Sequence, residues 1–252
     1  MRYLAALLLC LLALPGRAEE VVLGLSKDKV AITATFQGSE ILVFGAVKRE
    51  VPIPQEPLDV VVAVAGPKEP VVVRRKERRF GIWINTDAVE VDEAPSFYAI
   101  STTGPLNEVL SSVEDLRHRV SIPRAIRSVG APQGVTDAQS FTDAVIRIRK
   151  DNGAYTLQEG GVVLDEQTLF RTSIALPSNL TEGSYPTRIF LTRGGRVVSV
   201  FETTIDVRKV GLERWLYNMS REQPLLYGLM SLAIAIAAGW GASAAFRILR
   251  ER

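Results

Sequence analysis

The sequence predicts a mainly β protein of the α+β class: immunoglobulin-like β-sandwich regions with two amphipathic helices, followed by a single transmembrane helix. Three observations support this fold class. Between residues 19 and 208 most apolar residues alternate with polar ones, which is typical of half-buried strands. Two segments within that range have helical spacing instead. Near the C-terminus, residues 225–246 carry no charged side chain.

The first β region covers residues 19–104. Strands are expected over residues 30–36, 41–47, 58–65, 71–73, 80–84 and 96–100. Turn residues at 37–39 predict a hairpin of the first two strands, and Gly66-Pro67 predicts a second hairpin of the next two. Short strands at this spacing favour an immunoglobulin-like sandwich, here without the cysteine pair of true immunoglobulins.

A helical connector covers residues 105–153. Pro105 suits a first helical turn, and apolar residues from Leu106 to Leu116 then share one face. A second helix begins with a capping box of Thr136 and Gln139 and ends at Asn152-Gly153. We expect both helices to pack on a sheet through their apolar faces.

The second β region covers residues 154–208. Strands are expected over residues 162–164, 168–176, 187–191, 197–201 and 204–207, with a turn at Gly194-Gly195. This region forms either a second sandwich or the completion of the first. A joint between the two regions is expected within residues 121–135, which are rich in proline and glycine.

Residues 1–18 have the pattern of a signal peptide: a basic start, a short apolar run and a small-residue exit at Gly16 and Ala18. The formal charge of +2 is due to Arg2 and Arg17, so the mature protein would be neutral, which argues against a nucleic-acid binder. The single cysteine, Cys10, would be removed with this segment. We therefore expect no disulfide and no thiolate chemistry.

The C-terminal part predicts a membrane anchor in three pieces. Residues 209–223 have the spacing of an amphipathic juxtamembrane helix, and residues 224–246 are long enough to span a bilayer at about 1.5 Å per residue. Pro224 predicts a break between them. Residues 247–252 contain three arginines and one glutamate, so this tail is expected in the cytoplasm and the large domain on the exported side of the membrane.

Small residues recur at intervals of four along the predicted span. One row contains Ala235, Gly239 and Ser243, and another contains Ala237 and Gly241. Such rows let a second helix approach closely, so they predict an integral membrane partner or self-association. The alternative is that they reflect only the ordinary composition of membrane helices.

The residues needed for enzymatic chemistry are sparse. The only histidine, His118, lies at the end of a predicted helix, where a cation stabilises the C-terminal carbonyls. Glu90, Asp92 and Glu93 are close in sequence, but their alternation with valines is typical of a solvated strand face. We expect no enzymatic activity, no cofactor and no bound metal.

Five cations fall within six residues: Arg74, Arg75, Lys76, Arg78 and Arg79. This cluster could receive anionic lipid headgroups, an acidic partner or a small oxyanion. It could equally be a solvated hairpin tip whose charges prevent edge pairing.

Three segments carry a family resemblance: LERWLYNMSREQPLLYGLMSLAIAIAAGWGASAAFR, FTDAVIRIRKDNGAY and TLFRTSIALPSNLTEGSYPTRIFLTRGGRVVS. With them the chain resembles the alphaproteobacterial putative transmembrane protein family. The resemblance implies a periplasm-facing inner-membrane protein, with an association to sulfite-exporter-type transporters. It supplies no catalytic residues.

Three functions are therefore considered. The first is an accessory or interaction module for an inner-membrane partner such as a transporter. The second is a periplasmic oxyanion-binding or sensing domain that uses the arginine cluster. The third is a carboxylate-dependent envelope hydrolase that uses Glu90, Asp92 and Glu93.

Overall fold

The computed structural model describes residues 20–32, 36–49, 54–129, 135, 137–210 and 212–250. The expected signal peptide, the capping residue Thr136 and the last two residues of the expected tail lie outside the described residues. The chain forms two compact units. The first lies within Met1–Val30 and Phe36–Val207, and the second within Ala31–Thr35 and Arg208–Arg252.

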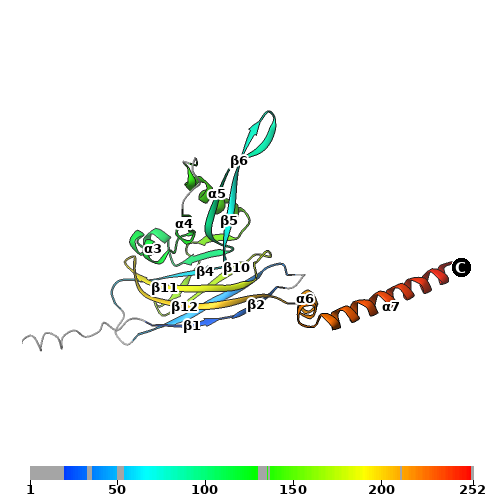
Figure 1. Cartoon of the computed structure of the whole chain (residues 1–252). Helices are drawn as coiled ribbons and strands as arrows, with labels where there is room; N and C mark the ends of the chain where they lie inside the picture. The colour runs from blue at the N-terminus through cyan, green and yellow to red at the C-terminus, as the bar shows by residue number, and fades with distance from the viewer. Residues whose placement is uncertain are drawn as a thin grey trace, which may run out of the picture. The chain divides into compact units, whose positions relative to one another are not determined.

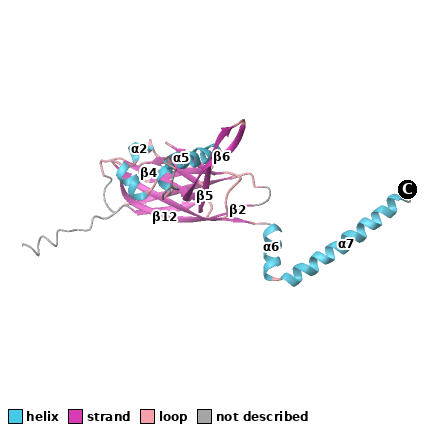
Figure 2. Cartoon of the chain, turned by 45° about the horizontal axis from the view of Figure 1, so that its top comes forward, coloured by secondary structure: helices cyan, strands magenta, loops and turns pink. Residues whose placement is uncertain are grey.

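Three sheets dominate the fold, as Figures 1 and 2 show. The four-stranded sheet has the order β1 (Glu20–Leu25), β3 (Ser39–Lys48), β10 (Leu169–Leu176) and β9 (Val163–Asp165). The six-stranded sheet has the order β2 (Lys29–Ile32), β12 (Arg196–Lys209), β11 (Gly183–Arg193), β4 (Leu58–Ala65), β7 (Tyr98–Thr102) and β8 (Tyr155–Gln158). The two-stranded sheet pairs β5 (Lys68–Arg79) with β6 (Ile82–Pro95). The predicted mainly β class is confirmed, while the immunoglobulin-like topology stays a prediction.

Strands from both β regions share the two larger sheets. β3 pairs antiparallel with β10, and β4 pairs antiparallel with β11. A buried hydrogen bond of 2.7 Å joins Ser101 Oγ of the six-stranded sheet to Thr172 Oγ1 of the four-stranded sheet. The second β region therefore completes the sheets that the first region begins.

Both predicted hairpins of the first β region are wrong. β2 and β3 lie in different sheets, because β3 pairs with β1 and β10 instead. β4 lies between β11 and β7, while β5 pairs with β6. The chain leaves the sheet after β4 because the Gly66 N–H donates to Phe97 O at 2.7 Å and Pro67 O accepts from Ser96 N at 2.8 Å. These bonds hold the start of β7, and not β5, against the end of β4.

The six-stranded sheet is covered on both faces. Val60 to Val64 are all at most 1% exposed. Val62 lies opposite Ser101, whose hydroxyl reaches the four-stranded sheet, so Val62 faces that sheet. Its neighbours Val61 and Ala63 face the other way, into a cluster with Val109, Val120 and Val145 of the helical connector. This double burial, at about 1.5 to 3 kcal/mol per large apolar side chain, stabilises the first unit.

The first predicted helix of the connector is interrupted. It forms α2 (Leu106–Val109) and α3 (Ser112–His118), because Leu110 is extended and Ser111 caps α3 by accepting from the Glu114 N–H. Val113 and Leu116 are exposed, so the expected continuous apolar face is wrong for α3. A short helix, α4 (Ile122–Ala125), follows within the expected joint.

The second predicted helix is α5 (Ala138–Asp151). The Asp137 carboxylate accepts from the Ser140 N–H and caps it, and its end at Asn152 and Gly153 is confirmed. Phe141 and Val145 are buried, as the helical spacing predicts. The turn at Gly194 and Gly195 between β11 and β12 is also confirmed, and both glycines have positive φ.

The second unit contains α6 (Leu212–Glu222) and α7 (Pro224–Arg250). The predicted break at Pro224 is confirmed, since one residue, Gln223, separates the helices. Within α7, Pro224–Ser243 is a stretch of 20 residues that is long and apolar enough to cross a membrane. None of this stretch is buried inside the protein.

Candidate interaction site on the arm

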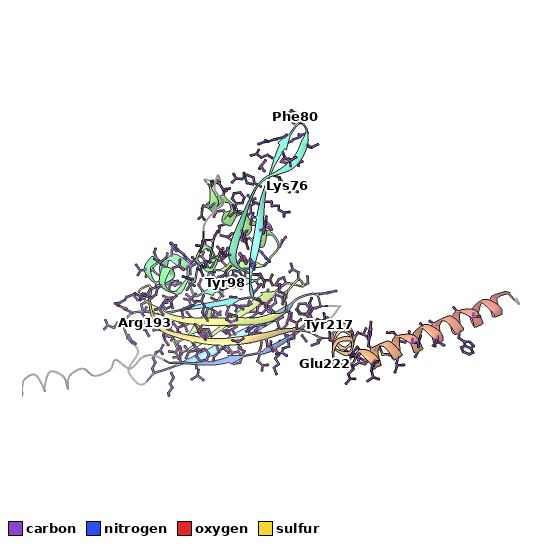
Figure 3. The ribbon with its side chains drawn as sticks, viewed as in Figure 1. Lys76, Phe80, Tyr98, Arg193, Tyr217 and Glu222 are labelled. Atoms are coloured by element: carbon purple, nitrogen blue, oxygen red, sulfur yellow. The ribbon has the colours of Figure 1, made fainter. Side chains whose placement is uncertain are left out.

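The ribbon of β5 and β6, hereafter the arm, extends away from the two larger sheets (Figure 1). Its two strands are joined by Phe80 and Gly81, and Figure 3 shows Phe80 at its free end. Both residues have positive φ, 52° for Phe80 and 85° for Gly81. This is the backbone of a two-residue I′ turn, whose twist matches that of a β-ribbon.

The base of the arm is fixed by apolar packing. Val89 and Val91 of β6 are at most 1% exposed, and Val71 and Val73 of β5 pack against the same core cluster. α5 covers this face with Val145. Alternate residues of the ribbon point away from α5 and are exposed, as the pleat requires.

Hydrogen bonds add to the anchoring at the base. Tyr155 donates through its hydroxyl to Pro95 O at 2.7 Å, and Arg149 donates to Ser96 O at 3.1 Å. Burial raises the pKa of Tyr155 to about 12, since the ionised phenolate would lose its hydration. The neutral phenol is therefore the form that holds β6.

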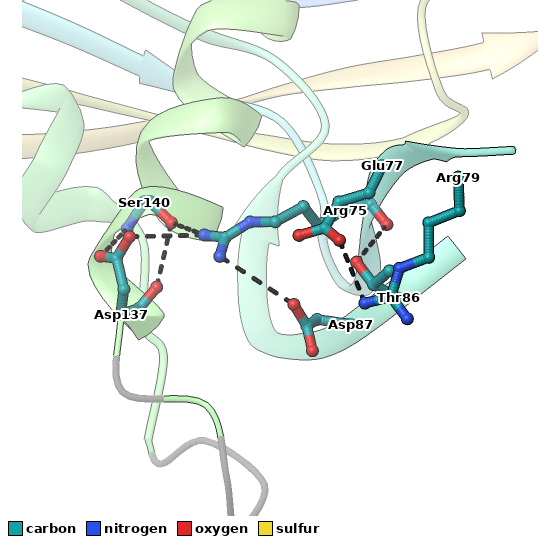
Figure 4. A network of polar contacts seen from close by, with 7 residues as sticks. All are labelled: Arg75, Glu77, Arg79, Thr86, Asp87, Asp137 and Ser140. Carbon is teal, nitrogen blue, oxygen red and sulfur yellow. Dashed lines mark hydrogen bonds and ion pairs between the residues drawn. The ribbon is translucent and has the colours of Figure 1, made fainter. Parts of the chain in front are cut away.

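The predicted arginine cluster lies within β5 itself, in the outer half of the arm, and not in a loop between strands. The structure separates its members by role. Arg75 points toward α5, and its guanidinium bonds the Ser140 hydroxyl, lies 3.3 Å from Asp137 Oδ2 and 4.0 Å from Asp87 Oδ2 (Figure 4). It also lies over the Phe141 ring, 4.6 Å from the centroid. Arg75 therefore joins the arm to α5.

The pKa of Asp137 is lowered, first by the hydrogen bonds from the Ser140 hydroxyl and N–H and then by the charge of Arg75. The ionised carboxylate accepts from the Ser140 N–H and from Arg75, while the Ser140 hydroxyl donates to the backbone Asp137 O at 3.0 Å. The N-terminal cap of α5 and the attachment of the arm thus share one carboxylate.

The remaining cations of the cluster differ in their pairing. Arg79 lies 3.4 Å from Glu77 on the same strand. Within the described parts of the chain, Arg74, Lys76 and Arg78 have no carboxylate within ion-pair distance. A cavity of about 290 Å³ between β5 and α5 is lined by Arg74, Arg75, Lys76 and Arg147, together with Val73, Ser140, Phe141 and Ala144. Arg78 and Arg79 lie beyond it, so the cluster does not form one site.

The three carboxylates considered for hydrolysis are placed differently. Asp92 accepts from the Val129 N–H at 2.6 Å. Glu93 lies 3.2 Å from Lys68 and 3.6 Å from Arg127, while Glu90 is exposed on the outer face of β6. Asp92 and Glu93 therefore hold the chain after α4 against the arm.

His118 lies at the end of α3, as predicted. Its Nε2 is 3.3 Å from Glu114 Oε2, and its ring meets Phe190 edge-on with 5.5 Å between centroids. Among the described residues, no group of three histidine, cysteine or acidic side chains is placed to hold a metal. The geometry around His118 is that of a packed helix terminus.

The apolar tip of the arm was not predicted from the sequence. Phe80 is fully exposed, and Trp83 and Ile82 are 69% and 64% exposed. Residues 80–84 were predicted as an ordinary strand. The available signal for an exposed tip was that Phe80 comes directly after the five cations and that no polar turn follows it.

An apolar cavity of about 430 Å³ at the four-stranded sheet was also not predicted. This cavity is lined by Val22, Leu23, Gly24, Phe44, Gly45, Ala46, Asp165, Leu169, Phe170 and Arg171. β1, which supplies part of this lining, was not predicted. Nothing in the spacing of these residues indicates that they meet, because four separate strands, β1, β3, β9 and β10, bring them together.

The small residues predicted as a helix interface lie on α7. Ala235, Gly239, Ser243, Ala237 and Gly241 are all exposed, and at Gly239 and Gly241 an added Cβ would meet nothing within 4 Å. Both rows therefore lie on the open surface of the second unit. The interface itself stays a prediction.

A family model described as Putative transmembrane protein (Alph_Pro_TM) matches residues 20–248, which include the sheets, the arm and most of α7. The chain belongs to this family. The predicted resemblance is confirmed. Among the described residues, α7 is the one helix that is long and apolar enough to span the membrane in this Alph_Pro_TM protein. The protein is thus a membrane protein anchored by a single C-terminal helix. No curated protein matches the chain.

Proposed function

We propose that this family member is a non-enzymatic, periplasm-facing module of a bacterial inner membrane that binds an integral membrane partner through α7. The observation that carries the proposal is the open surface of that helix. Gly239 and Gly241 have free space where a side chain would be, and no residue of Pro224–Ser243 is buried in the chain. Smooth rows of this kind allow close approach of a second helix, the main source of helix association in lipid.

The basic end of the sequence supports the orientation, because an excess of arginine after the span favours a cytoplasmic tail. The pattern of residues 1–18 supports export of the large domain. A transporter of the sulfite-exporter type is the partner that the family resemblance suggests. Self-association of α7 is the other outcome that the same surface allows.

Crosslinking and detergent pull-down of the full-length protein from its native membrane test this proposal. A variant with Gly239→Leu and Gly241→Leu fills the open surface, while Ile234→Leu and Ile236→Leu serves as a control that leaves it unchanged. We expect one multi-span protein, or a second copy of the chain, to be recovered and to be lost only with the glycine variant. Recovery that is equal for both variants would contradict a helix interface.

A second candidate function, oxyanion binding, is favoured by the cavity between β5 and α5. Arg74, Lys76 and Arg147 line it without ion-pair partners among the described residues, so their charges are available to an anion. Sulfate is the probe. We expect it to raise the melting temperature of the full-length protein, with loss of the shift in Arg74→Ser/Arg147→Ser. The matched control is Arg78→Ser/Arg79→Ser, whose side chains lie outside the cavity. An equal shift in both double variants would reject this site.

A further inference from the structure

The tip of the arm has more exposed apolar surface than its fold requires. Phe80 at the turn is fully exposed, and Ile82 and Trp83 are each at least 64% exposed. Large apolar side chains gathered at one free end are a marker of an interaction site. The base of the arm, not its tip, supplies the packing that stabilises it.

The turn residue itself indicates a role other than folding. Phe80 has a φ of 52°, a left-handed conformation that is unfavourable for a bulky side chain. Asparagine, aspartate or glycine would form the same I′ turn without this strain. An aromatic residue at this position therefore costs stability, which is consistent with a functional use of its side chain.

The apolar groups are distributed around the tip and do not form one flat face. β5 and β6 pair Arg78 with Trp83 and Arg79 with Ile82. Since successive residues of a strand alternate, these two pairs lie on opposite faces of the ribbon. A protein partner would cover one face, whereas a bilayer surrounds an inserted tip on all sides. The arrangement favours lipid.

Charge also favours an anionic lipid surface. From Lys76 to Thr86 the arm carries Lys76, Arg78 and Arg79 against Glu77 alone, three cations and one anion, for a net charge of +2. Their long side chains can bind headgroups while the apolar tip lies deeper, the usual order of basic and aromatic residues at a membrane surface. α7 already tethers the chain to a bilayer, so lipid is present at a high effective concentration.

We propose that the tip of the arm, Phe80, Ile82 and Trp83, inserts into the interfacial region of an anionic bilayer while Lys76 and Arg78 bind the lipid phosphates. This contact goes beyond the proposed partner binding by α7, because it needs no second protein. It makes the arm a second, peripheral membrane attachment in addition to the spanning helix.

Trp83 supplies the test in the full-length protein. The other two of the three tryptophans are removed as Trp215→Phe and Trp240→Phe, and the protein is placed in nanodiscs of phosphatidylcholine with about 30% phosphatidylglycerol. Brominated acyl chains quench tryptophan only on contact. We expect them to lower Trp83 emission at least twofold in these nanodiscs and less in pure phosphatidylcholine.

Charge reversal separates headgroup binding from simple proximity. Lys76→Glu/Arg78→Glu should reduce the quenching to its value in phosphatidylcholine, whereas Lys150→Glu/Arg196→Glu, an equal charge change at exposed sites off the arm, should preserve it. Equal emission with brominated and ordinary lipid would overturn tip insertion. Quenching that changes neither with lipid charge nor with charge reversal would overturn the phosphate contacts. Capture of a protein and no lipid by a photocrosslinker placed at position 80 in native membranes would show a protein occupant and also overturn the proposal.

Discussion

The guanidinium of Arg75 lies over the ring of Phe141, with 4.6 Å between Cζ and the ring centroid. The same group is within ion-pair distance of Asp87 on the arm and of Asp137 at the start of α5. One side chain thus joins a strand to a helix that follows it by more than sixty residues. Its removal should affect the arm more than any other change in the arginine cluster.

We expect Arg75→Ala to lower the free energy of unfolding by about 1 kcal/mol, because the ion pairs are partly exposed and the aromatic contact is worth a similar small amount. Arg75→Lys should recover only part of this loss, since an ammonium group does not reproduce a planar guanidinium that stacks and bonds at several points. Urea unfolding of the full-length protein in detergent measures both. Arg78→Ala is the control, with no measurable change. A loss as large for Arg78→Ala would show that the cluster acts only through its total charge.

The raised pKa of Tyr155 predicts that the protein loses stability at alkaline pH. The pKa of this tyrosine is raised to about 12 in the folded protein from 10.0, so its contribution is complete below pH 10 and is lost as the pH rises toward 12. Tyr155→Phe should cost about 1 kcal/mol at neutral pH, because the hydrogen bond to Pro95 O is lost. The difference between wild type and Tyr155→Phe should shrink above pH 10. Chemical unfolding across pH 7 to 11.5 measures it, with Tyr217→Phe, at an exposed tyrosine, as the control. A constant difference between wild type and Tyr155→Phe would contradict the assignment.

The buried pair of Ser101 and Thr172 should show strong coupling between the two larger sheets. Thr172→Val leaves the Ser101 hydroxyl without this partner, 2.7 Å away in the native structure, and should cost about 1 to 3 kcal/mol. Ser101→Ala together with Thr172→Val removes both polar groups, so it should cost less than the sum of the single changes. A double-mutant cycle by urea unfolding measures the coupling. Additive costs would mean that the two hydroxyls do not depend on each other.

The turn of the arm predicts opposite effects on stability and on lipid contact. Phe80→Asn should preserve or raise the free energy of unfolding, by up to about 1 kcal/mol, because asparagine tolerates a positive φ better than phenylalanine. The same change should reduce quenching of Trp83 by brominated lipid. Gly81→Ala at a φ of 85° is the matched change that should lower stability instead. Lower stability with Phe80→Asn would show that the aromatic ring supports the arm itself.

Local patterns predicted α5 and its end well, because its apolar spacing and Asn152-Gly153 act within one segment. The predicted helix from Leu106 failed where Ser111 competes for the backbone N–H of Glu114 and starts a new helix. Both predicted hairpins failed for a different reason. Alternation reveals that a segment is a strand but not which strand lies beside it.

The arginine cluster illustrates the same limit at the candidate site. Its five cations are adjacent in the sequence, yet Arg75 turns toward Asp137 and Phe141 while Arg78 lies beside Trp83. The apolar tip was visible as sequence but not as exposed surface. Exposure depends on whether another part of the chain covers a side chain, and no local pattern contains that information.

The sequence by itself determined the mainly β class, the family and the membrane helix. Each depends on composition or on a period within one continuous segment, since a helix of about 20 apolar residues needs no partner to satisfy its backbone in lipid. Only the tertiary structure decided that β3 pairs with β10 and β4 with β11, that the arm stands apart from the sheets, and that Phe80, Ile82 and Trp83 remain uncovered at its end. Each strand has many possible partners, and the energy of the whole core determines which strands pair and which side chains are buried.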